Sequence, residues 1–193
     1  MIAAIILAAG ESRRMGRPKA LVSYRGLTFI EHLLQATQHP RIGERRVVLG
    51  AHADEIRAQF PAGRFSVVVN DEWEKGPLSS IQAALRTLPP SGIDGIMICP
   101  VDHPLVSEKL VAALIDAFDS TGRGIVVPKF QSRRGHPVLF RSTLVPELMS
   151  APLDVGARAV VRAHRGEIVE VPTEEEAVVL NLNDPAALAR LGE

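Results

Sequence analysis

Short apolar runs separated by polar turns recur along the whole chain. They are rich in Val and Ile and are bounded by turn-forming residues, which is typical of β-strands. Several runs are apolar without a break, as expected of parallel strands that are covered on both faces. The pattern predicts strands at Ala3–Leu7, Arg46–Leu49, Phe65–Val69, Gly95–Cys99, Gly124–Val127, Val138–Phe140, Ile168–Val171 and Val178–Leu182.

Between these runs, apolar positions recur at the three- and four-residue spacing of amphipathic helices. This spacing predicts helices at Thr28–Thr37, Ser79–Leu88, Glu108–Phe118 and Pro185–Leu191. Ser107 and Asp184 precede two of them and can cap their first turns. Strands and helices alternate through the first two-thirds of the chain. We therefore expect an α/β protein, a three-layer α/β/α sandwich with a mostly parallel sheet, as a single domain over residues 1–193.

Composition and charge narrow the class of protein. The 193-residue chain is 46% hydrophobic, and its 22 Lys and Arg balance its 22 Asp and Glu. A nucleic-acid-binding surface usually carries a basic excess, so we expect no nucleic-acid partner. Cys99 is the single cysteine, which excludes a disulfide or a cysteine zinc site within one chain. The apolar start is shorter than the ~20 residues of a membrane helix, so we expect a cytoplasmic protein with no membrane partner.

The most unusual polar segment follows the first predicted strand and reads LAAGESRRMGRPKAL, residues 7–21. Gly10 and Gly16 permit close backbone approach, and amides after Gly10 can point into a concavity that binds anionic oxygens. Arg14 and Lys19 add positive charge suited to phosphate. The segment matches neither GxxxxGK[ST] nor GxGxxG. On these residues alone, an anion site and a polar surface turn are both open.

A carboxylate follows another buried strand, in the segment CPVDHPL. Asp102 lies between two prolines at the edge of the sheet where α/β proteins present ligands. Such a carboxylate suits Mg²⁺, which combines one or two carboxylates with phosphate oxygens and water. The alternative is that Asp102 only stabilises the turn before the next helix. We interpret His103 as a solvent-facing turn residue and Cys99 as a small buried core residue rather than a nucleophile.

The segment NDEWEKGPLSS, residues 70–80, also leads from a strand into a helix. Gly76 and the hydroxyls of Ser79 and Ser80 could present an edge that reads a base, or one serine could simply cap the helix. We interpret Trp73 as a packing residue. Three further polar segments each carry a weak signal: RRGHP at 133–137, DVGAR at 154–158 and LNLNDP at 180–185. The first, with two Arg and a His, could hold a second anionic substrate or remain solvated.

Together these segments resemble one family. The pattern L-A-A-G-x-S-x-R-M-G-x-P-K at residues 7–19 resembles the signature loop of the MobA-like NTP transferases, which activate sugars, alditols and molybdopterin. The later segments match in order, so the resemblance covers nearly the whole chain. It implies a Rossmann-like sheet of the nucleotide-diphospho-sugar transferase type.

Within that family, the chain resembles the molybdenum cofactor cytidylyltransferases. LAAG at 7–10, PVDHPL at 100–105, GHPVLF at 135–140 and GAR at 156–158 are similar to that branch. Gly76-Pro77-Leu78 instead resembles the guanylyltransferase branch, and Leu153 stands where the cytidylyl pattern has a glycine. The resemblance implies CTP as the nucleotide, with GTP as the alternative.

The resemblance also implies a role for each matching residue. The catalytic residues would be Arg14, Lys19 and Asp102. The nucleotide would contact Asp102 and the residues Ala8, Ala9, Gly10, Ser12, Arg14, Lys19, Gly76, Ser79 and Ser80. Mg²⁺ would be the cofactor, held by Asp102 and Asn183, with Asn181 as the alternative to Asn183. The acceptor would lie near Gly135, His136, Asp154 and Arg158.

The implied reaction is in-line attack of a phosphorylated acceptor, molybdopterin first, on the α-phosphorus of a nucleoside triphosphate, with release of pyrophosphate. The nucleophile is already ionised near neutral pH, so positioning and charge stabilisation dominate catalysis. A sugar or alditol phosphate is the alternative acceptor. The alternative to an enzyme is a nucleotide-binding module that delivers a cofactor, and a molybdoenzyme is a further candidate partner.

Overall fold

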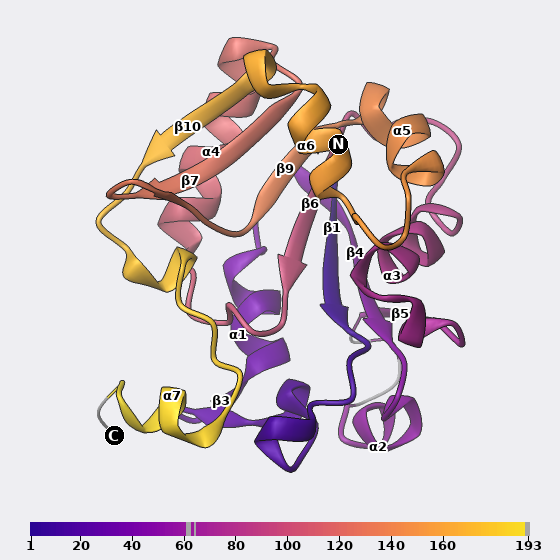
Figure 1. Cartoon of the computed structure of the whole chain (residues 1–193), viewed down its shortest axis with the longest axis vertical. Helices are drawn as coiled ribbons and strands as arrows, with labels where there is room; N and C mark the ends of the chain where they lie inside the picture. Colours follow the sequence, from indigo (N-terminus) through magenta and orange to yellow (C-terminus); the bar gives the residue numbers. More distant parts are fainter. Residues whose placement is uncertain (61–62, 64, 192–193) are drawn as a thin grey trace.

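A single central sheet organises the protein (Figure 1). The computed structural model describes residues 1–60, 63 and 65–191. Strands in the sheet follow the order β10-β7-β9-β6-β1-β4-β5, with β8 beside β7. The main sheet consists of β1 (Ile2–Ala8), β4 (Ile42–Leu49), β5 (Ser66–Val69), β6 (Gly95–Pro100), β7 (Ile125–Phe130), β8 (Arg133–Arg134), β9 (Val138–Arg141) and β10 (Ile168–Pro172).

The sheet is mostly parallel, as predicted. Among the strands of the main sheet in the described residues, only β9 and β8 run antiparallel to the strands beside them. A separate antiparallel pair, β2 (Ser23–Tyr24) and β3 (Leu27–Thr28), lies outside the main sheet. The predicted strands from Ala3–Leu7 to Ile168–Val171 are all present, with shifted ends.

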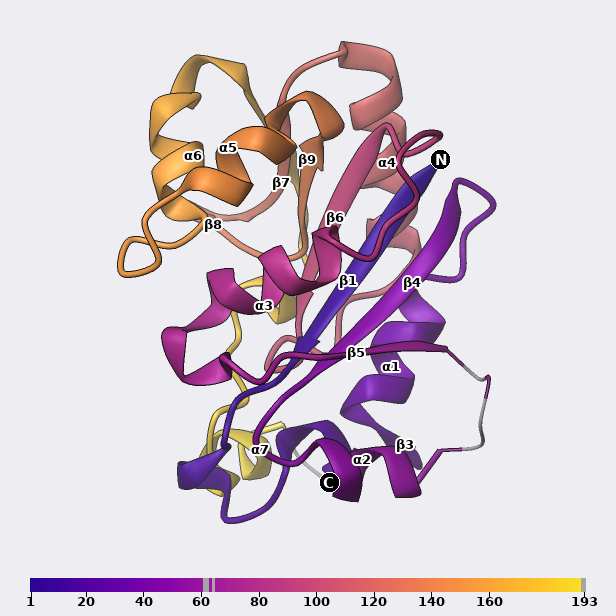
Figure 2. The same cartoon turned by 90° about the vertical axis from the view of Figure 1, so that its right-hand side faces the viewer.

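Helices cover both faces, which confirms the Rossmann-like three-layer α/β arrangement (Figure 2). Side chains of α1 and α4 pack on one face, and those of α3, α5 and α6 pack on the other. The helices are α1 (Phe29–Ala36), α2 (Ala53–Ala58), α3 (Pro77–Leu85), α4 (Glu108–Thr121), α5 (Val145–Ser150), α6 (Arg158–Ala163) and α7 (Pro185–Ala189). No helix in the described part of the chain is long and apolar enough to cross a membrane.

The unbroken apolar character of β1 follows from this double cover. Ile2 and Ile6 pack into the core shared with α1 and α4, whereas Ile5 packs into the core shared with α3. All three side chains are fully buried. Successive side chains of a strand point to opposite faces, so a strand between two helical layers is apolar at every position.

Two predicted helix caps are confirmed. The Ser107 Oγ accepts a hydrogen bond from the Leu110 amide at 3.0 Å, and the Asp184 Oδ1 accepts one from the Ala187 amide at 2.8 Å. By contrast, α3 begins at Pro77, two residues before the predicted start. Proline fits the first turn of a helix because that turn needs no amide donor there. The serines after Leu78 are therefore inside the helix and do not cap it.

The predicted strand Val178–Leu182 is wrong. The segment instead continues from a 3₁₀ helix at Glu176–Val178 into irregular backbone. Its apolar residues are nevertheless buried, with Val178 and Leu182 both 0% exposed. They cover the carboxyl end of the sheet rather than joining it as a strand, and an apolar run alone does not distinguish these two forms of burial.

Gly135 lies very close to this part of the chain, which we call the covering segment, residues 173–183. A Cβ on Gly135 would lie 2.2 Å from the carbonyl oxygen of Val178 and 2.6 Å from its carbonyl carbon. Both are backbone atoms, and the amide of the next residue, His136, donates to the same oxygen at 2.8 Å. Glycine is therefore required here by the space available.

We expect Gly135→Ala to lower the free energy of unfolding by about 1–3 kcal/mol, the usual cost of overpacking a filled site. Urea unfolding at pH 7 measures this change. Gly166→Ala is the matched control, because a Cβ there would meet nothing within 4 Å. Equal stability of the two variants would show that the backbone of Val178 moves at little cost to make room for the added methyl group.

Candidate functional site

The loop after β1 is folded by its own hydrogen bonds. The Ser12 Oγ accepts from the Lys19 amide at 3.0 Å, and the Ser12 carbonyl accepts from the Met15 amide at 2.9 Å. At the start of the loop, the Ala9 carbonyl accepts from the Ala51 amide at 3.1 Å, which ties the loop to the end of β4. These contacts turn the chain back so that Lys19 returns towards the carboxyl end of β1.

Lys19 meets the other end of the sequence. Its Nζ donates to the Asn183 Oδ1 at 2.7 Å, joining residues that are 164 positions apart. Burial lowers the pKa of Lys19 from its ordinary value, the charge of Asp102 opposes that shift, and the charge of Arg14 adds to it. Thus the catalytic set implied by the resemblance, Arg14, Lys19 and Asp102, is electrostatically coupled, with Asn183 in direct contact.

Asp102 lies in the turn directly after β6. The Val101 amide donates to the Leu7 carbonyl at 3.0 Å, which continues the pairing of β6 with β1 up to this turn. From the other side, the Leu182 amide donates to the Asp102 carbonyl at 2.8 Å. The backbone of Asp102 is thus held between the first strand and the covering segment, and the residue is partly exposed.

The donor set fits a divalent cation that arrives with a nucleotide. Among the described residues, no group of three or more His, Cys, Asp or Glu side chains is placed to hold a metal ion. Asp102 supplies one carboxylate, and the amide oxygen of Asn183 lies at the same site. Mg²⁺ is commonly held by one or two carboxylates together with phosphate oxygens and water, so the protein ligands alone need not form a cage.

His103 is not the solvent-facing residue that the sequence indicated. It is 6% exposed, and its ring centroid lies 4.8 Å from that of His136, with a 48° angle between the planes. Its Nδ1 is 3.4 Å from the Ala177 carbonyl oxygen. The covering segment buries this histidine. The burial of His103 depends on residues about 74 positions further along the chain, so no local sequence signal could have revealed this burial.

His136 is the centre of the predicted acceptor side. Burial lowers its pKa to about 4, with a further lowering by His103 and Arg158 and an opposing effect of Asp102. The ring is therefore neutral at pH 7, and its buried Nδ1 has no hydrogen-bond partner within the described structure. Asp102 and Arg158 thus both act electrostatically on the predicted acceptor residue His136, while Asp154 is exposed in the loop before α6.

In the segment predicted to read the base, the serine hydroxyls form hydrogen bonds within the protein. Ser79 and Ser80 are buried, and the Nδ2 of Asn70 donates to their hydroxyl oxygens at 2.9 and 3.0 Å. The Ser79 hydroxyl also donates to the Gly76 carbonyl at 2.8 Å. Gly76 itself has φ +95°, a conformation that favours glycine. The hydrogen bonds of Ser79 with Asn70 and with the Gly76 carbonyl hold the turn before α3.

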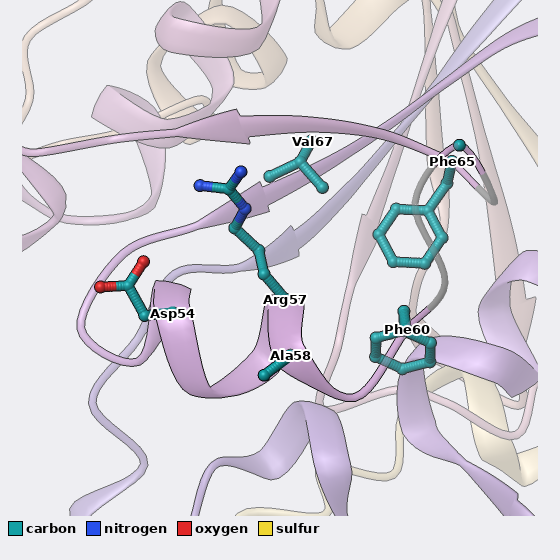
Figure 3. A pocket seen from close by; sticks show the side chains of 7 residues that line it. Asp54, Arg57, Ala58, Phe60, Phe65 and Val67 are labelled. Atoms are coloured by element: carbon teal, nitrogen blue, oxygen red, sulfur yellow. The ribbon is translucent and has the colours of Figure 1, made fainter.

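A cavity of about 580 Å³ lies away from these residues, between α2 and β5 (Figure 3). The rings of Phe60 and Phe65 meet edge-on there, with centroids 5.2 Å apart, and Arg57 lies beside them. None of the described lining residues is a predicted site residue. The cavity is therefore separate from the candidate site.

The model of the MobA-like NTP transferase domain matches residues 4–168, which include most of the candidate site. The chain belongs to the MobA-like NTP transferase family. Membership confirms the resemblance drawn from the loop at 7–19 and makes the chain a nucleotidyltransferase of the MobA-like type.

Two relatives of this MobA-like protein carry names from different reaction classes. A molybdenum cofactor guanylyltransferase from Cereibacter sphaeroides is 34% identical over 188 residues, which cover 96% of this chain and 93% of the relative. A nicotine blue oxidoreductase from Paenarthrobacter nicotinovorans is 32% identical over 171 residues, which cover 83% and 81%. The shared sequence therefore establishes the family rather than the substrate.

Solved structures are similar over nearly the whole of this MobA-like chain. Rv0371c from Mycobacterium tuberculosis H37Rv has a TM-score of 0.85 with 27% identity, over 98% of this chain and 96% of that one. A second structure of that protein, a complex with manganese, has a TM-score of 0.81, with the same identity and coverage of 98% and 97%. A divalent metal thus binds a structural relative.

Cys99, as expected, is a buried core residue. Burial raises the pKa of its thiol to about 12. We expect roughly a thousandfold less thiolate at pH 8 than for a thiol at the ordinary value of 9.0, and hence very slow labelling of the native protein by DTNB. The same measurement in 6 M guanidinium is the control. Rapid labelling of the folded protein would contradict the burial of Cys99.

Proposed function

We propose that this protein is a Mg²⁺-dependent molybdenum cofactor nucleotidyltransferase that uses CTP. The observation that carries the proposal is the convergence of Lys19, Asp102 and Asn183 at the carboxyl end of the sheet. A triphosphate has four negative charges, and this site offers cations for its oxygens together with one carboxylate for its metal ion. Ligands of open α/β sheets bind at this edge.

Lys19 and Arg14 would hold the triphosphate and offset the charge that develops on the departing pyrophosphate. Lys19 is half-buried, so its charge is screened less by water than that of an exposed lysine. Its hydrogen bond to Asn183 fixes the direction of the ammonium group before a nucleotide arrives. Such preorganised charge is usually the largest single contribution to catalysis of this kind.

Asp102 and Asn183 would hold Mg²⁺, which supplies Lewis-acid polarisation of the phosphate oxygens when bound. The acceptor would enter from the side of His136 and Arg158. Arg158 would supply a positive charge for the acceptor phosphate, and the neutral ring of His136 would lie on the same side. An acceptor phosphate is already ionised at neutral pH, so the site needs no general base.

Removing either charge from the centre should stop turnover. We expect Lys19→Ala and Asp102→Ala each to lower kcat by about 10²–10³, by analogy with the loss of one preorganised donor to a developing charge. Pyrophosphate release measures the effect, and circular dichroism checks the fold. Arg17→Ala is the control, because Arg17 is an exposed cation of the same loop. Near-normal turnover of either Lys19→Ala or Asp102→Ala would refute the site.

GTP is the second candidate nucleotide. It is favoured by the relative from Cereibacter sphaeroides that is named a guanylyltransferase, and by the segment Gly76-Pro77-Leu78. CTP is favoured by LAAG at 7–10 and GHPVLF at 135–140. Because the hydroxyls of Ser79 and Ser80 are bonded to Asn70, backbone groups around Gly76 are the better candidates for contacts with the base.

We expect pyrophosphate release with CTP and molybdopterin to exceed that with GTP, UTP or ATP by at least about tenfold in kcat/KM, a preference of ~1.4 kcal/mol. The assay runs all four nucleotides with and without molybdopterin. Faster turnover with GTP would assign the guanylyl alternative. Turnover only with a sugar or alditol phosphate would refute the proposed acceptor, and nucleotide binding without any turnover would indicate a delivery module.

A further inference from the structure

The chain between β10 and α7 crosses the candidate site as a covering segment, residues 173–183 (Figure 1). Val178 and Leu182 anchor it by full burial. Its backbone bonds the two site segments, since the His136 amide donates to the Val178 carbonyl and the Leu182 amide donates to the Asp102 carbonyl, each at 2.8 Å. The covering segment ends at Asn183, whose Oδ1 accepts the hydrogen bond from Lys19.

Glu175 makes a second attachment from the same covering segment. Its Oε1 accepts from the Ser107 hydroxyl at 2.5 Å, and its Oε2 accepts from the Ser107 amide at 3.1 Å. Ser107 is the residue that caps α4, so the carboxylate lies at the positive end of the helix dipole. The Glu175 amide donates to the Thr173 Oγ1 at 3.1 Å, which fixes the backbone that presents the carboxylate.

These two attachments hold opposite ends of one loop. The loop runs from Asp102, whose carbonyl accepts from Leu182, to Ser107, which donates to Glu175. The loop therefore moves only if the covering segment moves with it. Because the covering segment also carries Asn183, a displacement at Glu175 would shift both the carboxylate and the amide oxygen of the candidate site.

The structure assigns Glu175 as a positioning residue that locks the Asp102 loop to the covering segment and so sets the geometry of the Mg²⁺-nucleotide site. This inference rests on the proposed function. Glu175 touches none of the reacting groups and acts through Ser107, Asp102 and Asn183. Groups that orient the ligands of a metal typically change metal affinity or activity by 10–100-fold when they are lost.

The test compares three variants of the full chain. Glu175→Ala removes both hydrogen bonds to Ser107, and Glu175→Gln keeps an oxygen that can accept one of them. Glu174→Ala is the matched control, because Glu174 is an exposed glutamate one position earlier in the covering segment. The readouts are the Mg²⁺ concentration for half-maximal pyrophosphate release, kcat, the melting temperature, and hydrogen exchange of the Leu182 amide without metal or nucleotide.

We expect Glu175→Ala to raise the Mg²⁺ half-saturation about tenfold and to speed exchange of the Leu182 amide, while the protein stays folded. Glu175→Gln should recover most of the loss, and Glu174→Ala should match the wild type. A residue that only caps α4 would lower the melting temperature but leave the Mg²⁺ half-saturation and the Leu182 amide unchanged. That pattern would overturn the inference.

The proposed function and this inference fail in different ways. If the wild-type protein releases no pyrophosphate with any nucleotide and acceptor, the proposed function is wrong. If the wild type is active and Glu175→Ala matches it in kcat and Mg²⁺ half-saturation, only the assignment of Glu175 is wrong. Hydrogen exchange of the Leu182 amide is measured without substrates, so it tests in either case whether Glu175 holds the backbone of the covering segment against Asp102. An unchanged exchange rate in Glu175→Ala would refute that connection.

Discussion

The hydrogen bond between the Lys19 ammonium and the Asn183 amide oxygen joins the loop after the first strand to the segment before the last helix. This closure brings Lys19, Asp102 and Asn183 together at the carboxyl end of the sheet. It places a cation beside Asp102, and it requires the covering segment at 173–183 to cross the carboxyl end of the sheet. Without that crossing, His103 would be exposed and the Asp102 loop would be held only by its own strand.

The sheet makes the closure possible. Parallel strands end at one edge, so the loops after β1 and β6 meet although they are about 90 residues apart. The helices of both faces bury the strands, which leaves their carboxyl ends as the open edge of the layer. The short contact of Gly135 with the Val178 backbone then joins the third part of the site to the same edge.

The pKa values of side chains at this edge of the sheet depend on burial as much as on neighbouring charges. Burial lowers the pKa values of Lys19, His103 and His136, and the carboxylate of Asp102 opposes each of these shifts. A site poised in this way favours an anionic ligand, because a bound phosphate group would stabilise the charged form of the lysine. Burial favours the neutral form of both histidines, which line the side that we assign to the acceptor.

The sequence by itself determined the mostly parallel α/β fold and two helix caps, because these depend on local patterns. Through its family resemblance it also led to the prediction that Arg14, Lys19 and Asp102 form the catalytic set. Only the tertiary structure decided that residues 178–182 cover the sheet rather than extend it, that His103 is buried, and that Ser79 and Ser80 bond to Asn70. It also brought Glu175 to Ser107. These outcomes depend on contacts between segments distant in sequence, and burial by a crossing segment leaves the same apolar pattern as burial in a strand.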